Sequence, residues 1–175
     1  MDTNSRILCY DIRDLGKQLL PVGMLVVLDS VFNRIIRNRR LGRSTWVYID
    51  EIYLLFQHEY SANFLFTLWK RVRKYGACCT GLTQNVDDLL QSHTARTMLA
   101  NSEFLVMLNQ ASTDRAELAR LLNISDNQLS YITNVDFGRG LIKCGSAIVP
   151  FMDHFPKNNL YRLMSTKPSE ADAAV

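Results

Sequence analysis

The sequence lacks the features that mark secreted and membrane-spanning chains. No unbroken apolar run among its 175 residues approaches the roughly 20 needed to cross a bilayer. The stretch from Met1 to Arg6 does not show the basic-then-apolar order of a signal peptide. We therefore expect neither secretion nor a transmembrane segment.

The cysteines, the histidines and the net charge give no support for a metal centre or for nucleic-acid binding. The sequence has no C-x-x-C and no Cys/His pair at zinc spacing, so it does not predict a metal centre. The four cysteines, which lie in or beside apolar runs, are expected to be buried and reduced: Cys9, Cys78, Cys79 and Cys144. A formal charge of +3 is too small to argue for nucleic acid by itself.

Short apolar runs separated by helical patterns predict an α/β fold. The expected strands are Ile7–Tyr10, Trp46–Ile49, Ala77–Leu82, Phe104–Leu108, Leu141–Cys144 and Ala147–Phe151. The first four lack polar alternation, which is typical of strands covered on both faces in a parallel sheet. The last two flank Gly145–Ser146, which predicts a C-terminal β-hairpin.

Helical patterns occupy the intervening segments. The expected helices run from about Pro21 to Gly42, over Ala62–Tyr75, Val86–Leu90 and Thr94–Leu99, and from capping boxes at Asp114/Glu117 and Ser125/Gln128. Because no repeat or internal linker is present, we predict one domain over residues 1–165. Residues 166–175 are predicted to form a disordered tail.

The most informative segment is the apolar run Trp46–Ile49, which is followed directly by Asp50 and Glu51. In open α/β sheets, ligands bind at the carboxyl ends of the strands. Asp50 there suits Mg²⁺, and Glu51 suits a group that orients or deprotonates a water attacking a γ-phosphate. This is a Walker B pattern with a catalytic glutamate, although a strand ending in two solvated acids has the same sequence.

Two further segments offer polar groups for the same chemistry. Ala77–Leu82 is followed by Gln84, which would contact the γ-phosphate or the attacking water, or would merely adjoin a helix cap. Arg71 and Arg73 lie near a helix end, where cations also compensate the helix dipole. Since they cannot share a helix face, only one of them would serve as an arginine finger.

A second basic cluster favours a solvated face and consists of Arg34, Arg37, Arg39, Arg40 and Arg43. Arg34, Arg37 and Arg40 are expected on one side of the first helix. The alternatives for the cluster are a contact with a neighbouring subunit or with DNA phosphates.

Several segments resemble one family of ATPases. YDIRDL, WVYIDEIYLLF, LWKRVRKYG, TGLTQNVDDLL and FGRGLI are similar to the C-terminal motor domain of conjugal-transfer ATPases of type IV secretion systems. These are the fourth VirB component and its relatives, in the FtsK/HerA-like branch of RecA-type motors. The resemblance implies a RecA-like P-loop NTPase core with a mostly parallel sheet, and ATP and Mg²⁺ as ligands.

The same resemblance implies roles for individual residues. Asp50 and Glu51 correspond to the Walker B acids, with Asp50 toward the metal, and Gln84 corresponds to the sensor glutamine. Arg73 is the best match for the finger, and Arg139 is a weaker candidate for phosphate or interface contacts. A hexameric ring and contacts with other secretion-system components are also implied, at the cytoplasmic face of the bacterial inner membrane.

One family motif is missing from this chain. The phosphate loop G-x-x-x-x-G-K-[ST] is absent, and Gly16–Lys17–Gln18 lacks both the upstream glycine and the hydroxyl residue. We therefore expect the loop to precede residue 1 in a longer polypeptide, and we expect the chain alone to bind nucleotide poorly.

Three functions fit these residues. The first is part of an ATP-hydrolysing motor of a conjugative secretion system, which the joint presence of Asp50, Glu51, Arg73 and Gln84 favours. The second is a DNA-translocating motor of the coupling-protein or HerA type, which would share the same site. The third is a non-catalytic interaction module that keeps the motor fold.

Overall fold

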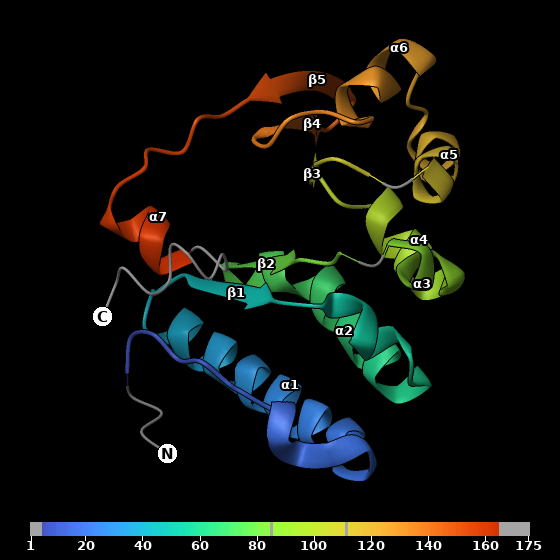
Figure 1. The fold of residues 1–175 in the computed structure, drawn as a ribbon. Coiled ribbons are helices and arrows are strands. Elements are labelled where there is room, and N and C mark those ends of the chain that lie inside the picture. The colour runs from blue at the N-terminus through green and yellow to red at the C-terminus, as the bar shows by residue number, and fades with distance from the viewer. Residues whose placement is uncertain (1–4, 85, 111, 165–175) are drawn as a thin grey trace. The chain divides into compact units, whose positions relative to one another are not determined.

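The computed structural model describes residues 5–84, 86–110 and 112–164 (Figure 1). It divides into two compact units, Met1–Asn101 and Ser102–Val175, which are described separately. The predicted tail, 166–175, lies outside the described residues, and the domain over 1–165 stays a prediction.

The first unit combines helices with a two-stranded sheet. Its elements are η1 (Arg13–Leu15), α1 (Gly16–Arg40), β1 (Thr45–Ile49), η2 (Ile52–Phe56), α2 (Glu59–Arg71), η3 (Val72–Tyr75), β2 (Ala77–Gly81), α3 (Val86–Gln91) and α4 (His93–Ala100). β1 and β2 pair in parallel, from Thr45 opposite Ala77 to Ile49 opposite Gly81. The predicted parallel pair and its flanking helices are thus confirmed (Figure 1).

The core of this unit lies between the helices and one face of the sheet. Leu65 and Leu68 of α2 and Ile35 of α1 are almost fully buried in it. On β1, Val47 and Ile49 pack against this core, whereas Trp46 and Tyr48 are 65% and 67% exposed. The expectation that this strand is covered on both faces is therefore wrong for the described residues. Alternate side chains point to opposite sides of a strand, and only one side meets the helices.

The expected strand Ile7–Tyr10 does not form. Its residues have no regular secondary structure, and Ile7 is 81% exposed. A strand needs a hydrogen-bonded neighbour, and within the described part of the first unit β1 and β2 pair only with each other. The segment instead contacts α1, where the Tyr10 hydroxyl lies 2.9 Å from Ser30 Oγ.

Helix α1 is longer than predicted. It begins at Gly16, so Pro21 lies inside the helix and not in its first turn. Contrary to the expectation from unbroken apolar runs, Gln18–Arg40 contains an 18-residue window of mean hydropathy 1.7, which length and composition alone would allow to cross a membrane. Core helices of soluble proteins and signal sequences meet the same criterion. Met24 and Leu28 of α1 are buried in the core of the unit, but only 17% of the apolar window is buried.

The second unit is built on an antiparallel sheet. Its elements are β3 (Phe104–Met107), α5 (Ser112–Leu122), α6 (Asp126–Leu129), η4 (Ser130–Ile132), β4 (Arg139–Cys144), β5 (Ala147–Met152) and α7 (Asn159–Met164). The sheet order is β3-β4-β5. The hairpin is confirmed, with Gly145 at φ 57° in its turn, as is the capping box of Ser125 and Gln128.

Other predictions for these residues need correction. Phe104–Leu108 forms a strand, but β3 pairs antiparallel with β4 and not within a parallel sheet. Asp114 lies inside α5, because that helix begins at Ser112. All four cysteines are free, but none is fully buried. Cys79 is half-buried, and burial, together with the neighbouring Cys78, raises its pKa to about 12.

Candidate functional site

The acids and the glutamine predicted to share a site leave the same edge of the β1–β2 sheet. Asp50 and Glu51 directly follow β1, and Gln84 comes three residues after β2. Because the strands are parallel and Ile49 is opposite Gly81, the segments that follow β1 and β2 both begin at the carboxyl edge of the sheet. Carboxylate and amide groups therefore gather where an open α/β sheet binds its ligand.

Two backbone hydrogen bonds fix the segment between these acids and β2. The Leu82 N–H donates to the Ile49 carbonyl at 2.8 Å, and the Ile52 N–H donates to the Leu82 carbonyl at 2.9 Å. Asp50 and Glu51 thus form a two-residue loop, and the residues on either side of it, Ile49 and Ile52, are both hydrogen-bonded to Leu82. These bonds fix the position of the loop relative to Leu82, which follows β2 and precedes Gln84.

Glu51 has an unusual backbone and an unusual side chain. It adopts φ 48° and ψ 49°, the left-handed region that non-glycine residues rarely occupy. Its Oε2 is buried, and within the described part of the chain this oxygen has no hydrogen-bond partner. Strained backbone and unsatisfied buried polar atoms concentrate at functional sites, so both observations distinguish Glu51 from a solvated acid at a strand end.

Asp50 presents a different environment. It is exposed, and its Oδ1 accepts a hydrogen bond from the Glu51 N–H at 3.1 Å. No cluster of three or more His, Cys, Asp or Glu side chains occurs among the described residues. Mg²⁺ is commonly held by only one or two carboxylates together with water and phosphate oxygens. An exposed aspartate beside an unsatisfied glutamate oxygen therefore fits Mg²⁺ bound to a nucleotide.

The predicted arginine finger lies elsewhere in the first unit. Arg73 is exposed in η3, which precedes β2, whereas Gln84 follows β2. A parallel strand separates the two residues, so Arg73 is near the amino end of the sheet, and Asp50 and Glu51 are at its carboxyl end. The structure therefore does not bring Arg73 together with the acids of its own chain. Arg71, at the end of α2, is also exposed.

Arg139 belongs to the second unit, where it begins β4. Its guanidinium lies 3.6 Å from the Asp136 carboxylate, and its side chain is 49% exposed. An ion pair this exposed contributes little stability, so the contact leaves the role of Arg139 undefined.

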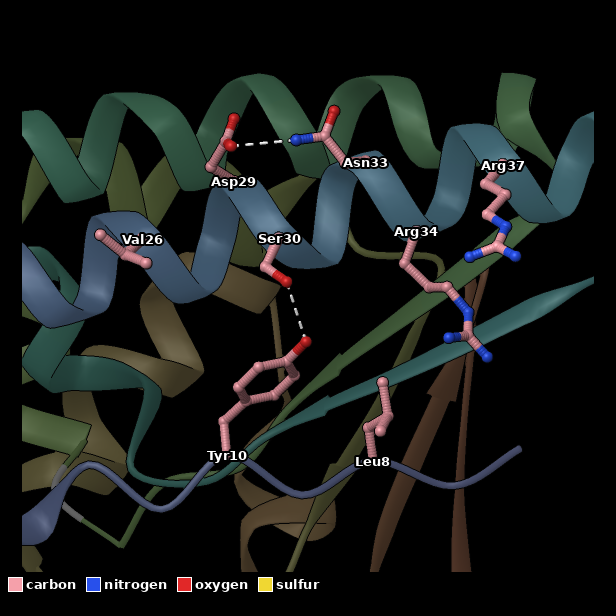
Figure 2. Close-up of a pocket in the computed structure, with 8 residues that line it drawn as sticks. All are labelled: Leu8, Tyr10, Val26, Asp29, Ser30, Asn33, Arg34 and Arg37. Atoms are coloured by element: carbon pink, nitrogen blue, oxygen red, sulfur yellow. Dashed lines mark hydrogen bonds between the residues drawn. The ribbon is translucent and has the colours of Figure 1, made fainter. Parts of the chain in front are cut away.

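The basic cluster on α1 makes local contacts. Arg34 donates to the Ser5 carbonyl at 2.8 Å, and the Arg39 guanidinium lies 5.1 Å from the centre of the Tyr75 ring. Arg34 and Arg37 line a groove of about 400 Å³. Figure 2 shows their side chains between α1 and the segment containing Leu8 and Tyr10. The lining of this groove includes none of the predicted site residues.

Sequence reasoning missed two residues beside the site, Gly81 and Ile52. An added Cβ on Gly81 would overlap Ile52 Cδ1 and lie 3.2 Å from Ile52 Cγ2. The sequence signal was a glycine inside an apolar strand, which indicates close approach of another group without saying which one.

Comparisons with known proteins agree with this geometry. A family model described as the TraG P-loop domain matches residues 3–139. The structure of VirB4 of Thermoanaerobacter pseudethanolicus superposes with a TM-score of 0.73 at 26% sequence identity, covering 83% of this chain. The chain spans 41% of the length of that VirB4 chain. Comparison with curated proteins gives no match.

Proposed function

The chain belongs to the TraG P-loop domain family of conjugation and type IV secretion ATPases, and on this basis we propose that it is part of an ATP-hydrolysing motor. It would form the C-terminal portion of a RecA-like ATPase domain that energises substrate transfer or channel assembly in a conjugative type IV secretion system. Both the family match and the VirB4 likeness support this assignment.

The residues at the sheet edge have distinct roles in this proposal. Asp50 holds Mg²⁺, directly or through water, and Mg²⁺ when bound neutralises charge on the β- and γ-phosphate oxygens. Glu51 orients the attacking water and accepts its proton. Gln84 hydrogen-bonds the γ-phosphate or that water. The single observation that carries the proposal is the buried, unpartnered Oε2 of Glu51, which has the free acceptor capacity that a base requires.

The remaining parts of the ATP site come from other segments. The phosphate loop is absent from the sequence, and in this proposal residues outside these 175 supply it. We place it before residue 1 of a longer polypeptide, consistent with the 41% of the VirB4 chain that this chain spans. Arg73, which lies near the opposite end of the sheet from Asp50 and Glu51, would act on the neighbouring subunit of a hexameric ring. Arg139 stays a candidate for phosphate or interface contacts.

We place this ring at the cytoplasmic face of the cell membrane, in contact with other secretion-system components.

Replacing Glu51 with glutamine tests the proposal. In the polypeptide that carries these residues together with a phosphate loop, Glu51→Gln should leave binding of a fluorescent ATP analogue within a few-fold of wild type. Hydrolysis should fall by about 10²-fold or more, because the amide cannot accept the proton. Phosphate release measures the rate.

Glu59→Gln provides the matched control, since it makes the same change at an exposed position at the start of α2. Its hydrolysis should equal that of wild type. Undiminished hydrolysis in Glu51→Gln, or a wild-type polypeptide that binds but never hydrolyses ATP, would contradict the proposal. The latter result would favour the non-catalytic module.

A further inference from the structure

Gly81 and Ile52 approach each other closely beside the proposed catalytic glutamate. Ile52 follows Glu51 and begins η2, and its side chain lies against the Cα of Gly81 at the end of β2. Any side chain at position 81 would overlap Ile52 Cδ1 and come within 3.4 Å of Ile52 Cβ. The contact therefore depends on the absence of a side chain at this position.

Ile52 has little freedom to move away. It is 5% exposed and belongs to the core cluster that includes Leu55 and Leu89. Close-packed interiors transmit a displacement to neighbouring atoms, because few voids can absorb it. To accommodate an added Cβ, the Ile52 side chain must repack within this core, or its backbone, which adjoins Glu51, must move.

The same contact also reaches Gln84. Leu82 follows Gly81 and is hydrogen-bonded on both sides of the acids, to Ile49 and to Ile52. A backbone movement at Gly81 or Ile52 would act directly on these bonds. It would thereby alter the position of Glu51 relative to the segment that carries Gln84.

We propose that the Gly81–Ile52 contact is a positioning element that holds Glu51 in its left-handed conformation and in fixed register with Gln84. This inference rests on the proposed function, because the positioning matters only if Glu51 acts on a bound nucleotide. Gly81 and Ile52 are positioning residues and do not touch the substrate.

Three variants test the contact: Gly81→Ala, Ile52→Val, and the two combined. Gly81→Ala introduces the overlap, and Ile52→Val removes the Cδ1 atom that would be struck. Thr80→Ala, at an exposed position of the same strand, is the matched control. Thermal unfolding of each variant establishes that it is folded.

The first readout is hydrogen exchange of the peptide that contains the Ile52 amide, measured in the 175-residue chain. This amide donates to the Leu82 carbonyl, so it reports the register directly. We expect several-fold faster exchange in Gly81→Ala and a return toward the Ile52→Val rate in the double variant. Unchanged exchange in Gly81→Ala would overturn the proposal without any reference to ATP.

The second readout is hydrolysis in the polypeptide that also carries a phosphate loop. Gly81→Ala should lower kcat by roughly 10- to 10²-fold with little change in KM, the effect expected when a catalytic group is displaced by about 1 Å. The double variant should recover most of the rate of Ile52→Val, and Thr80→Ala should match wild type.

The two proposals fail in different ways. If the wild-type polypeptide that carries a phosphate loop does not hydrolyse ATP, the proposed function is refuted. The catalytic purpose of the Gly81–Ile52 contact is then refuted with it. Active wild type with full activity in Gly81→Ala, or with no rescue by Ile52→Val, would overturn the positioning role alone.

Discussion

Glu51 combines two features that lower the stability of a folded chain. A non-glycine residue in the left-handed region costs on the order of 1–2 kcal/mol. The Oε2 of Glu51 is also buried, with no hydrogen-bond partner among the residues that the structure describes. Neither feature helps β1 or η2 to form, since Ile49 and Ile52 make the hydrogen bonds that join this edge to β2. Such costs persist where a function requires them.

Glu51→Asn should therefore stabilise the chain. Asparagine tolerates the left-handed conformation better than glutamate and does not bury a carboxylate oxygen. We expect the free energy of unfolding to rise by about 1 kcal/mol, measured by urea denaturation of the 175-residue chain.

Asp50→Asn is the control for this measurement, because Asp50 is exposed and keeps an oxygen to accept the Glu51 N–H. It should change the unfolding free energy by less than about 0.5 kcal/mol. A loss of stability in Glu51→Asn greater than in the control would show that the Glu51 side chain supports the fold.

At the scale of elements, local sequence chemistry was most reliable where it acts within one turn. The Ser125 and Gln128 capping box forms as predicted, with the Ser125 N–H donating to Gln128 Oε1 at 3.0 Å. Gln128 Nε2 also donates to the Ile148 carbonyl at 3.2 Å, which joins α6 to β5. One side chain thus both begins a short helix and fixes it to the hairpin.

Removing the cap should destabilise the chain measurably. Ser125→Ala should lower the free energy of unfolding by about 1 kcal/mol, the usual effect of losing an N-cap hydroxyl. Gln128→Ala should cost more, because it also removes the bond to β5.

Asn127→Ala, in the same turn but outside the capping box, should stay within about 0.5 kcal/mol of wild type. Circular dichroism during urea unfolding gives all three values. Equal effects for Ser125→Ala and Asn127→Ala would show that the box contributes nothing.

At the scale of the whole molecule, the proposed site is divided between chain segments. Asp50, Glu51 and Gln84 meet at one edge of the β1–β2 sheet, whereas Arg73 precedes β2 at the other end. In the proposed ring, an arginine placed there would complete the site of a neighbouring subunit and not that of its own chain. Catalysis would then require assembly.

Mixing two inactive variants tests this arrangement. Glu51→Gln and Arg73→Ala should each abolish most hydrolysis in the polypeptide that carries a phosphate loop. In mixed rings, some interfaces combine an intact Glu51 with an intact Arg73, so partial activity should return.

Subunit exchange must be confirmed independently, for instance by energy transfer between labelled copies. With exchange confirmed, a failure to regain activity would exclude an arginine finger acting between subunits. Repeating the mixing experiment with Arg71→Ala in place of Arg73→Ala shows which of the two arginines acts on the neighbouring site.

The sequence by itself determined the apolar runs that become β1 and β2, the acids that follow the first of them and the C-terminal hairpin. These features depend on local chemistry: apolar runs of strand length, carboxylates at a strand end, and a Gly-Ser turn between two runs. The family resemblance followed from the order and spacing of the same segments.

Only the tertiary structure decided which strands pair, which faces are covered and how Glu51 is held. Ile7–Tyr10 is as apolar as a strand but pairs with no strand among the described residues, and Phe104–Met107 pairs antiparallel with β4. The Gly81–Ile52 contact joins segments far apart in sequence, and the burial of Glu51 Oε2 is visible only in the folded chain. Local patterns record what a residue prefers, whereas pairing and packing depend on which neighbour reaches it, and that is fixed only when the chain folds.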